Sequence, residues 1–217
     1  MITLVIPEMK EKPDLGLKRE KLPLVEEFFS IQGEGFHTGK AAYFIRLGGC
    51  DIGCSWCDTP FSWDTELHPM VETDTIIDHI IKSGTDSVVV TGGEPLMWNL
   101  DYLCSGLKQK NICTFIETSG AYPLSGEWDW ICLSPKRNMP PGNEICSAAD
   151  ELKVIIEDES DFDWAEKYRK LVDKKCRLFL QPEWKIFESI IPEIVTYVKK
   201  NPSWRISLQV HKFMHIP

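Results

Sequence analysis

Three cysteines lie close together in the stretch GGCDIGCSWCDTPF, which spans residues 48–61. They are Cys50, Cys54 and Cys57, and thiols clustered in this way point to a metal site before disulfides in a chain without secretory features. A structural zinc site uses four ligands that commonly come as two pairs, and no second pair lies nearby. Electron-transfer iron–sulfur clusters also bind four thiolates. Three thiolates on a [4Fe–4S] cluster would leave one iron open for a substrate or cofactor, as catalytic zinc sites keep one open position.

The other five cysteines are scattered through apolar segments, and we predict that they are small buried core residues. From the residues alone, zinc with a distant fourth ligand stays open as an alternative. The protein would then be a non-catalytic module that binds zinc or carries electrons. The scattered cysteines are Cys104, Cys113, Cys132, Cys146 and Cys176.

Composition points to a globular chain of 217 residues, with 43% apolar and 26% charged residues. No apolar run reaches the roughly 18 residues that cross a bilayer, and residues 1–16 carry too short an apolar run for a secretion signal. We therefore expect a cytoplasmic protein. The net charge of −9, from 24 Lys and Arg against 33 Asp and Glu, disfavours a nucleic-acid partner because phosphate binding needs clustered cations. A small molecule is the expected substrate.

Strand-like apolar runs alternate with helical patterns along the chain, which predicts an α/β fold. Several runs are continuous and rich in β-branched residues, as in parallel strands that are covered on both faces. The predicted strands are residues 24–32, 41–49, 86–93, 111–120, 128–135, 150–156, 175–182 and 205–211. The predicted helices are residues 72–84, 99–110, 161–172 and 187–202, the last starting late or bending at Pro192.

The predicted helices are too few for a closed eight-fold barrel, which typically takes about 250 residues. An open partial (β/α) barrel with a mostly parallel sheet fits, with residues 1–23 as an N-terminal extension and residues 24–217 as one domain. In such folds the ligand lies beyond the carboxyl ends of the strands. Glycines and polar residues follow the predicted strands at those ends, in the segments SIQGEG, TGGEP, ETSG, SPK and QPEW.

The cysteine spacing, with the aromatic Trp56 just before the last cysteine, resembles the signature of the radical S-adenosylmethionine (radical SAM) superfamily. GGEP at residues 92–95 is similar to the loop that binds the amino group of S-adenosylmethionine (SAM) in that superfamily. Residues 24–217 also resemble the 7-carboxy-7-deazaguanine synthase family, through SIQGEG, FIRLGGC, FIETSG, DELKVII and the ending WRISLQVHKFMHIP. SIQGEG and the ending QVHKFMHIP are far more specific than the cysteines. The resemblance implies a radical SAM type of partial barrel.

The resemblance implies that Cys50, Cys54 and Cys57 bind a [4Fe–4S] cluster, whose open iron takes the amino and carboxylate groups of SAM. QPEW departs from relatives at its third and fourth positions, so Glu183 and Trp184 are expected to act through backbone atoms. The implied SAM contacts are Gly93, Glu117, Ser134, Pro135, Lys136, Gln181, Pro182, Glu183 and Trp184.

The resemblance also implies a substrate site. Gln32 and Glu34 would pair with the amide-like edge of a pterin, and the Arg46 guanidinium suits a carboxylate. The terminal carboxylate of Pro217 is expected to reach the substrate, and Thr59 to help hold Mg²⁺, which prefers oxygen ligands. The implied substrate contacts are Ile31, Gln32, Gly33, Glu34, Arg46, Thr91, His211 and Pro217.

The implied reaction is the radical ring contraction of 6-carboxy-5,6,7,8-tetrahydropterin to 7-carboxy-7-deazaguanine with loss of ammonia, on the route to queuosine and related deazapurines. SAM and the reduced cluster would supply the radical, so no residue is expected to act as a classical acid or base. A homodimer and a flavodoxin- or ferredoxin-type reductant are implied as well. The alternative within the superfamily is a glycyl-radical activating enzyme that acts on a protein partner, which gives no reason for SIQGEG or the ending His-Ile-Pro.

Overall fold

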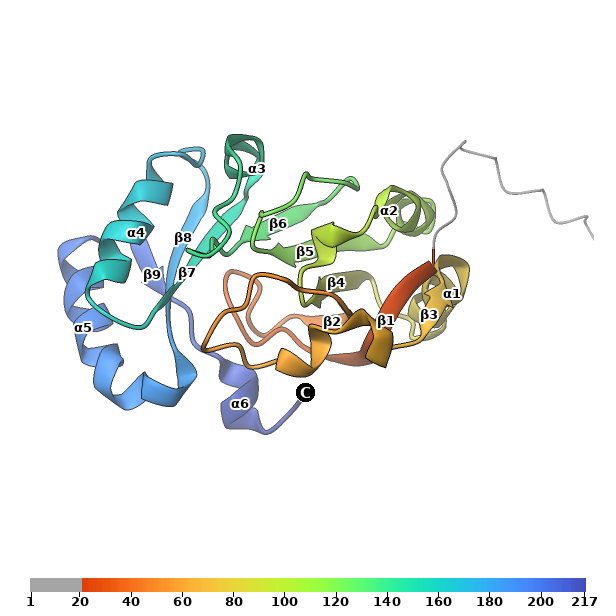
Figure 1. The fold of residues 1–217 in the computed structure, drawn as a ribbon, viewed down its shortest axis with the longest axis horizontal. Coiled ribbons are helices and arrows are strands. Elements are labelled where there is room, and N and C mark those ends of the chain that lie inside the picture. The colour runs from red at the N-terminus through yellow and green to blue at the C-terminus, as the bar shows by residue number, and fades with distance from the viewer. Residues whose placement is uncertain (1–20) are drawn as a thin grey trace, which may run out of the picture.

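Nine strands form one open sheet in the computed structural model, which describes residues 21–217 (Figure 1). The strands are β1 (Lys21–Ile31), β2 (Ala41–Leu47), β3 (Met70–Glu72), β4 (Ser87–Gly92), β5 (Cys113–Thr118), β6 (Trp130–Leu133), β7 (Glu151–Ile156), β8 (Arg177–Pro182) and β9 (Trp204–Ile206). Their order is β3-β1-β2-β4-β5-β6-β7-β8-β9, so β3 and β9 are the two edges. From β2 to β9 all neighbours are parallel, whereas β1 is antiparallel to both β2 and β3. The predicted open, mostly parallel α/β fold is confirmed.

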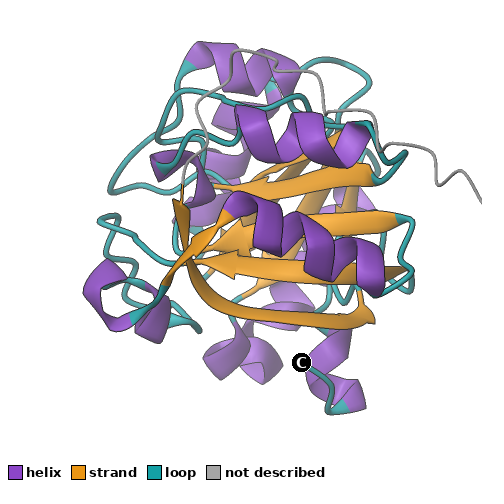
Figure 2. Ribbon diagram, turned by 90° about the vertical axis from the view of Figure 1, so that its right-hand side faces the viewer, coloured by secondary structure: helices purple, strands orange, loops and turns teal. Residues whose placement is uncertain are grey.

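Helices cover the outer face of this sheet, as Figure 2 shows. They are α1 (Thr73–Lys82), α2 (Asp101–Lys108), α3 (Asn143–Ala148), α4 (Ser160–Arg169) and α5 (Phe187–Lys200). Helix α6 (Val210–Met214) instead lies with the chain end beside the segment that follows β2 (Figure 1). The 3₁₀ helices η1 (Pro60–Ser62), η2 (Thr65–Leu67), η3 (Pro95–Met97) and η4 (Trp184–Ile186) lie in the connecting segments. Within residues 21–217, no helix has both the length and the apolar character to cross a membrane.

Side chains alternate between the two faces of each central strand, because successive residues of a strand point to opposite sides. In β2, Tyr43, Ile45 and Leu47 are buried in the main core on the helical side, whereas Phe44 and Arg46 face inward. The inward face carries a smaller apolar cluster of Ala42, Phe44, Val89 and Phe115, with Phe28 and Trp130 packed against it.

The same alternation places polar side chains on the inward face at the carboxyl ends of the strands. Arg46 of β2 lies opposite Thr91 of β4. Val90, the residue before Thr91, lies opposite Ile116 of β5. The inward polar residues of five strands are Arg46, Thr91, Glu117, Lys153 and Gln181. The inner face of the sheet therefore carries an apolar cluster, and the polar side chains at the carboxyl ends of the strands form a polar rim beside it.

The strand predicted at residues 205–211 is wrong beyond Ile206, where β9 ends and the chain turns into α6. Ser207 explains the turn. Its hydroxyl donates to Gln181 Oε1 at 2.7 Å and accepts from the Gly35 amide at 2.9 Å. These two bonds direct the chain across the inner face, towards the loop between β1 and β2, instead of along the sheet edge.

Helix α5 starts at Phe187, five residues before Pro192, so the late start, one of the two predicted alternatives, is wrong, and a bend at Pro192 stays a prediction. Proline removes one amide from the helix and disfavours the helical conformation in the residue before it. Pro192 is exposed, so the carbonyl that loses its partner can bond to water.

The first strand begins at Lys21, inside the stretch that we predicted to be an N-terminal extension. Leu22 belongs to the main core with 1% of its surface exposed, so residues 21–23 are part of the sheet. Residues 1–20 lie outside the described part of the chain. Strand β3 and helix α3 were not predicted, because both are short and lack a clear period.

Candidate active site

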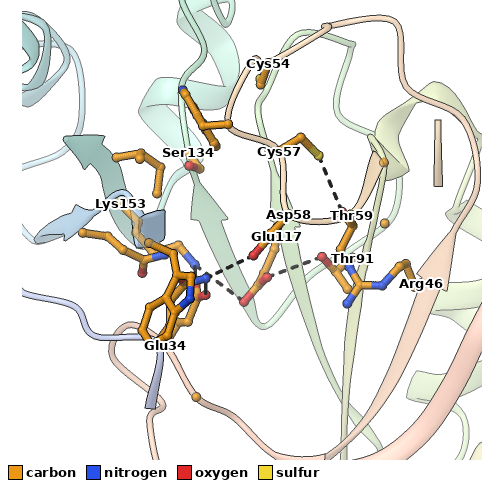
Figure 3. Close-up of a pocket in the computed structure, with 18 of the residues that line it drawn as sticks. Glu34, Arg46, Cys54, Cys57, Asp58, Thr59, Thr91, Glu117, Ser134 and Lys153 are labelled. Carbon is orange, nitrogen blue, oxygen red and sulfur yellow. Dashed lines mark hydrogen bonds and ion pairs between the residues drawn. The ribbon is translucent and has the colours of Figure 1, made fainter. Parts of the chain in front are cut away.

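A pocket with a volume of about 280 Å³ opens at the carboxyl ends of the parallel strands (Figure 3). It is lined by the loops after β1, β2, β4 and β5, by the segments after β6 and β8, and by the C-terminal segment. Figure 3 shows Glu34, Arg46, Glu117 and Lys153 pointing from four different elements towards a common space. Segments that are far apart in the sequence therefore meet around a single cavity.

The three clustered cysteines line one end of this pocket, on the loop between β2 and η1. All three are free, half-buried thiols. Of the five scattered cysteines, four are buried as predicted, whereas the prediction is wrong for Cys113, which is exposed because it lies at the start of β5. Among the residues that the structure describes, no three His, Cys, Asp or Glu side chains are arranged to hold a single metal ion. Three free thiols that line one cavity could each bind a different iron of a multi-iron cluster.

The cysteine loop is fixed by hydrogen bonds from two other loops. The Asn138 side chain donates to the Ile52 carbonyl oxygen at 2.9 Å, and the Tyr122 hydroxyl donates to Asp51 at 2.6 Å. The Ile52 side chain is buried, with 5% of its surface exposed. The loop is therefore anchored from the sides of β5 and β6.

Lys136, in the turn after β6, lies against the same loop. Its ammonium donates to the Ser134 carbonyl oxygen at 2.9 Å and lies 5.1 Å from the centre of the Trp56 ring. Burial lowers the pKa of Lys136, although the thiolate charge of nearby Cys54 opposes that effect. Burial in turn raises the pKa of Cys54, against the charge of Lys136. Metal binding by this thiol would release a proton.

The glycine loop after β4 is joined directly to the cysteine loop. The Gly93 amide donates to the Leu47 carbonyl oxygen at 2.9 Å, and the Glu94 amide donates to the Gly49 carbonyl oxygen at 2.8 Å. A Cβ atom on Gly93 would lie 2.3 Å from that Gly49 oxygen, so only glycine permits this approach. Gly93 thus brings bare backbone to the edge of the pocket beside Cys50.

Glu94 fastens the glycine loop to the end of β5. Its side chain is buried, and both of its carboxylate oxygens accept two hydrogen bonds. Oε1 accepts from the Leu96 amide at 3.0 Å and the Thr118 hydroxyl at 2.5 Å, and Oε2 accepts from the Ser119 amide at 2.8 Å and the Ser119 hydroxyl. The carboxylate is fully engaged with protein donors, so its contribution to the site is structural.

Replacing Glu94 with alanine is expected to lower the free energy of unfolding by about 3–5 kcal/mol, because several buried donors lose their charged acceptor. Urea unfolding followed by circular dichroism measures this change. Glu144→Ala, at an exposed position in the first turn of α3, is the matched control and should change stability by less than about 0.5 kcal/mol. Equal stability losses in the two variants would contradict the assigned role of Glu94.

Glu117 lies at the centre of a polar network on the inner face. Its Oε1 accepts from Gln32 Nε2 at 2.9 Å, and its Oε2 lies 3.4 Å from the Thr91 hydroxyl that donates to it. Gln32 Oε1 in turn accepts from the Glu34 amide at 3.1 Å. The loop after β1 is therefore linked to β4 and β5 through side chains that line the pocket.

Glu34 is held at both of its carboxylate oxygens. Oε2 accepts from the ammonium of Lys153, and Oε1 accepts from Gln209 Nε2 at 2.9 Å. Burial alone would raise the pKa of Glu34. The charge of Lys153, with the hydrogen bonds from Lys153 and Gln209 and the nearby His211, outweighs burial and lowers that pKa to about 2. Glu34 is consequently an ionised, acceptor-only group at the pocket wall.

Arg46 is oriented by an acidic neighbour on β1. Its Nε donates to Glu26 Oε1 at 2.7 Å, and its side chain is only 17% exposed. The Phe28 and Phe44 rings beside it are stacked with centroids 5.3 Å apart and also line the pocket. The pocket therefore has an aromatic surface next to a guanidinium whose terminal nitrogens bond to none of the residues that the structure describes.

The C-terminal segment closes the pocket on the side of β1. The Val210 amide donates to the Gly33 carbonyl oxygen at 2.9 Å, and the Ser30 hydroxyl donates to the Pro217 carbonyl oxygen at 3.1 Å. Lys212 donates to Asp58 in the cysteine loop at 3.2 Å. Burial lowers the pKa of His211, although the charge of Glu34 opposes it. The segment joins the loop after β1 to the loop that carries the cysteines.

Replacing Gly33 with alanine is expected to displace this segment, because a Cβ atom there would lie 2.2 Å from His211 Nδ1. Turnover should fall by roughly 10- to 100-fold, while stability falls by about 1–3 kcal/mol, the usual cost of overpacking. Steady-state kinetics and thermal unfolding measure the two effects. Gly142→Ala, at an exposed position where φ is −72° and nothing lies within 4 Å of the added carbon, is the matched control, and an equal loss of turnover there would contradict the contact.

The structure brings together almost every site residue that we predicted. All the predicted ligands of the cluster, of SAM, of Mg²⁺ and of the substrate line this pocket, with the exception of Pro135. Pro135 is buried behind the pocket wall, where its carbonyl oxygen accepts from the Trp164 indole at 3.4 Å. The Glu183 carboxylate accepts from the Ile186 amide at 3.1 Å, so this side chain caps η4.

Several residues that line the pocket were not predicted, among them the polar residues Lys153 and Gln209. The sequence pattern could have predicted the place of Lys153, because Glu151 and Lys153 alternate with Leu152 and Val154 in an otherwise apolar strand. Charged residues at every second position of a strand covered on both faces must lie on an inner polar face. Gln209 gave no such signal, since its place depends on the turn after β9.

Comparisons with known proteins agree with this geometry. Residues 44–132 match the model of the radical SAM superfamily. The 7-carboxy-7-deazaguanine synthase of Flavobacterium psychrophilum is 54% identical, with 92% of this chain and 95% of the relative covered. The enzyme of Synechocystis sp. is 44% identical, with 89% of this chain and 93% of the relative covered. That of Escherichia coli K12 is 32% identical, with 89% of this chain and 98% of the relative covered.

The crystal structure of QueE from Escherichia coli superimposes with a TM-score of 0.74 at 27% sequence identity, covering 88% of this chain and 95% of that one. The similarity extends over nearly the whole chain in sequence and in structure, and it includes the cysteine loop and the glycine loop. The chain therefore belongs to the 7-carboxy-7-deazaguanine synthase family and is a radical SAM enzyme, with a [4Fe–4S] cluster and SAM as its cofactors.

Proposed function

We propose that this enzyme converts 6-carboxy-5,6,7,8-tetrahydropterin to 7-carboxy-7-deazaguanine with release of ammonia. The observation that carries the proposal is one pocket that joins three free thiols and a glycine loop at one end to Glu34, Arg46 and His211 at the other. The first end suits the cofactors, and the second suits a small ligand with N–H donors and a carboxylate. The identities of the relatives support the same product.

The cluster and SAM, when bound, supply the one-electron chemistry that a ring contraction of this kind requires. Cys50, Cys54 and Cys57 would bind three irons of the cluster and leave the fourth for SAM. Support for the SAM site comes from the pocket lining, which includes Gly93, Glu117, Ser134, Lys136 and the segment 181–184. The Glu183 carboxylate is engaged in capping η4, so we assign its contact with SAM to its backbone.

The substrate would lie at the other end of the pocket, against the residues of the loop after β1. The ionised Glu34 carboxylate can accept hydrogen bonds from the amino group and ring N–H of a pterin. The terminal nitrogens of Arg46 can form a paired contact with the pterin carboxylate. Gln32 already bonds to Glu117 and to the Glu34 amide, so we assign it mainly to positioning. The remaining substrate contacts are Ile31, Gly33, Thr91, His211 and Pro217.

We also assign Mg²⁺ to Thr59, with the substrate carboxylate and water completing its shell. Mg²⁺ usually keeps several waters and shares few protein oxygens with its substrate. Thr59 lines the pocket beside Cys57, which places a hydroxyl between the two ends of the site. Asp58 is engaged by Gln209 and Lys212 at 3.2 Å each, so Thr59 is the better ligand of the two.

The chain's own residues would bind, orient and shield the reactants. The C-terminal segment bonds to the loop after β1 and to the cysteine loop, which excludes water from the side of β1. A homodimer and a flavodoxin- or ferredoxin-type electron donor are supported by the family resemblance alone.

Anaerobic reconstitution tests this proposal. The protein is loaded with iron and sulfide and then given SAM, dithionite and 6-carboxy-5,6,7,8-tetrahydropterin, and the products are identified by mass spectrometry. The expected result is 7-carboxy-7-deazaguanine that depends on SAM and reductant. Added Mg²⁺ should raise the rate in the native protein and have less effect in Thr59→Ala. SAM cleavage without the deazapurine product would overturn the proposal and favour a different substrate.

A further inference from the structure

Lys153 is a buried cation that the proposed function does not use. It lies on the inward face of β7, and its side chain is only 6% exposed. Its ammonium donates to Glu34 Oε2 and lies 3.9 Å from Glu117 Oε1. Lys153 therefore bridges a carboxylate that we assign to the substrate and one that we assign to SAM.

The charges around Lys153 come from several elements. The mutual attraction of the buried cation and its acidic neighbours offsets the cost of taking them out of water. Burial alone would lower the pKa of Lys153, but the charges of Glu117 and Glu34 raise it well above its usual value. The titratable groups that face Lys153 are Glu34, Glu117, Cys132, Glu151 and Lys136, and those that face Glu34 are Lys153 and His211.

The two contacts of Lys153 differ in strength. The bond to Glu34 is direct, whereas Glu117 lies at 3.9 Å and is held at the same oxygen by Gln32 at 2.9 Å and at the other by Thr91. Glu34 has only Gln209 besides Lys153 as a side-chain donor among the described residues. Loss of Lys153 should therefore release Glu34 and leave Glu117 in place.

We propose that Lys153 is a positioning and specificity-determining residue, which keeps Glu34 as a fixed acceptor and so selects a substrate edge that carries N–H donors. The inference rests on the proposed function, because it takes Glu34 as the group that binds the pterin edge. A carboxylate held by Lys153 on Oε2 and Gln209 on Oε1 cannot rotate freely, so its remaining lone pairs point in set directions. A protonated or mobile Glu34 would lose this selectivity for donors.

The test measures binding without turnover. Reconstituted enzyme with SAM and no reductant is titrated anaerobically with 6-carboxy-5,6,7,8-tetrahydropterin by calorimetry at several pH values between 6 and 8. In Lys153→Met the dissociation constant of the pterin should rise by roughly 10- to 100-fold, and the rise should be larger at pH 6 than at pH 8. Burial of Glu34 is then unopposed by Lys153, its pKa rises, and protonation as the pH falls removes the acceptor.

Matched variants separate positioning from a merely structural role. Lys153→Arg should recover most of the affinity and the pH dependence of the native protein, because it restores the cation. The dissociation constant of SAM should change by less than about threefold in Lys153→Met, since Glu117 keeps its other donors. Lys199→Met, at an exposed position of α5, should bind the pterin like the native protein.

A double variant keeps the test valid if Lys153→Met folds poorly. Lys153→Met with Glu34→Gln removes the uncompensated charge, so it should fold better than Lys153→Met alone. Its pterin affinity should equal that of Glu34→Gln, because Lys153 acts through Glu34. Equal losses of pterin and SAM affinity, additive effects in the double variant, or an unchanged pH dependence would overturn the inference. Failure of the native enzyme to form the deazapurine would instead overturn the proposed function.

Discussion

Cys54→Ala is expected to abolish turnover and cluster loading while leaving the fold intact. The Cys54 thiol is half-buried and lines the pocket, and it belongs to neither apolar cluster. Without it only two clustered thiols remain, and two thiolates cannot hold three irons of a cluster. Enzymes that lose the cofactor carrying their chemistry forfeit most of a rate enhancement of about 10⁶-fold or more, so no product should be detectable.

Three measurements check this expectation: iron content, the visible absorption of the cluster, and product formation after anaerobic reconstitution. Thermal unfolding of the protein without iron should be unchanged within the range of ordinary surface substitutions, about 0.5 kcal/mol. Cys113→Ala, at an exposed position at the start of β5, is the matched control and should load iron and turn over normally. Native iron content in Cys54→Ala, or its loss in Cys113→Ala, would show that the cluster lies elsewhere.

The sheet was predictable because its signal is local. Apolar runs that alternate with helical patterns located the central strands, and the parallel order follows from the helical crossovers. The alternation of side chains also decides which residues share a face. Phe44 and Arg46 lie on the inner side of β2, whereas Ile45 and Leu47 lie in the main core. Once the strand ends are known, the polar rim of the pocket follows from this period of two.

The end of the chain was not predictable in the same way. RISLQVH has the alternation of a strand, and nothing within it shows that Ser207 will bond to Gln181 and to the Gly35 amide. Those partners are distant in sequence, so tertiary contacts override the local pattern. Lys153 was overlooked for a different reason. Its alternation with apolar residues was visible, but its meaning depends on Glu34, which comes from a loop far away.

Arg46→Met is expected to give the second large effect, on substrate binding alone. Methionine keeps an apolar stem beside Phe44 and removes the guanidinium that we assign to the pterin carboxylate. A hydrogen bond to a charged group contributes about 1.5–3 kcal/mol, so the dissociation constant of the pterin should rise by roughly 10- to 150-fold. The dissociation constant of SAM should stay within about twofold, because sites without shared partners behave independently.

Graded variants show whether geometry or charge is responsible. Arg46→Lys restores the charge without the planar fork, so it should recover only part of the affinity. Glu26→Gln keeps an acceptor for Arg46 Nε but removes its charge, and its effect should be smaller still, about threefold. Arg205→Met, at an exposed position of β9, is the control and should bind the pterin normally. If Arg46→Met binds the pterin as tightly as the native protein, the carboxylate of the substrate lies away from β2, and the orientation of the pterin in the pocket must be reversed.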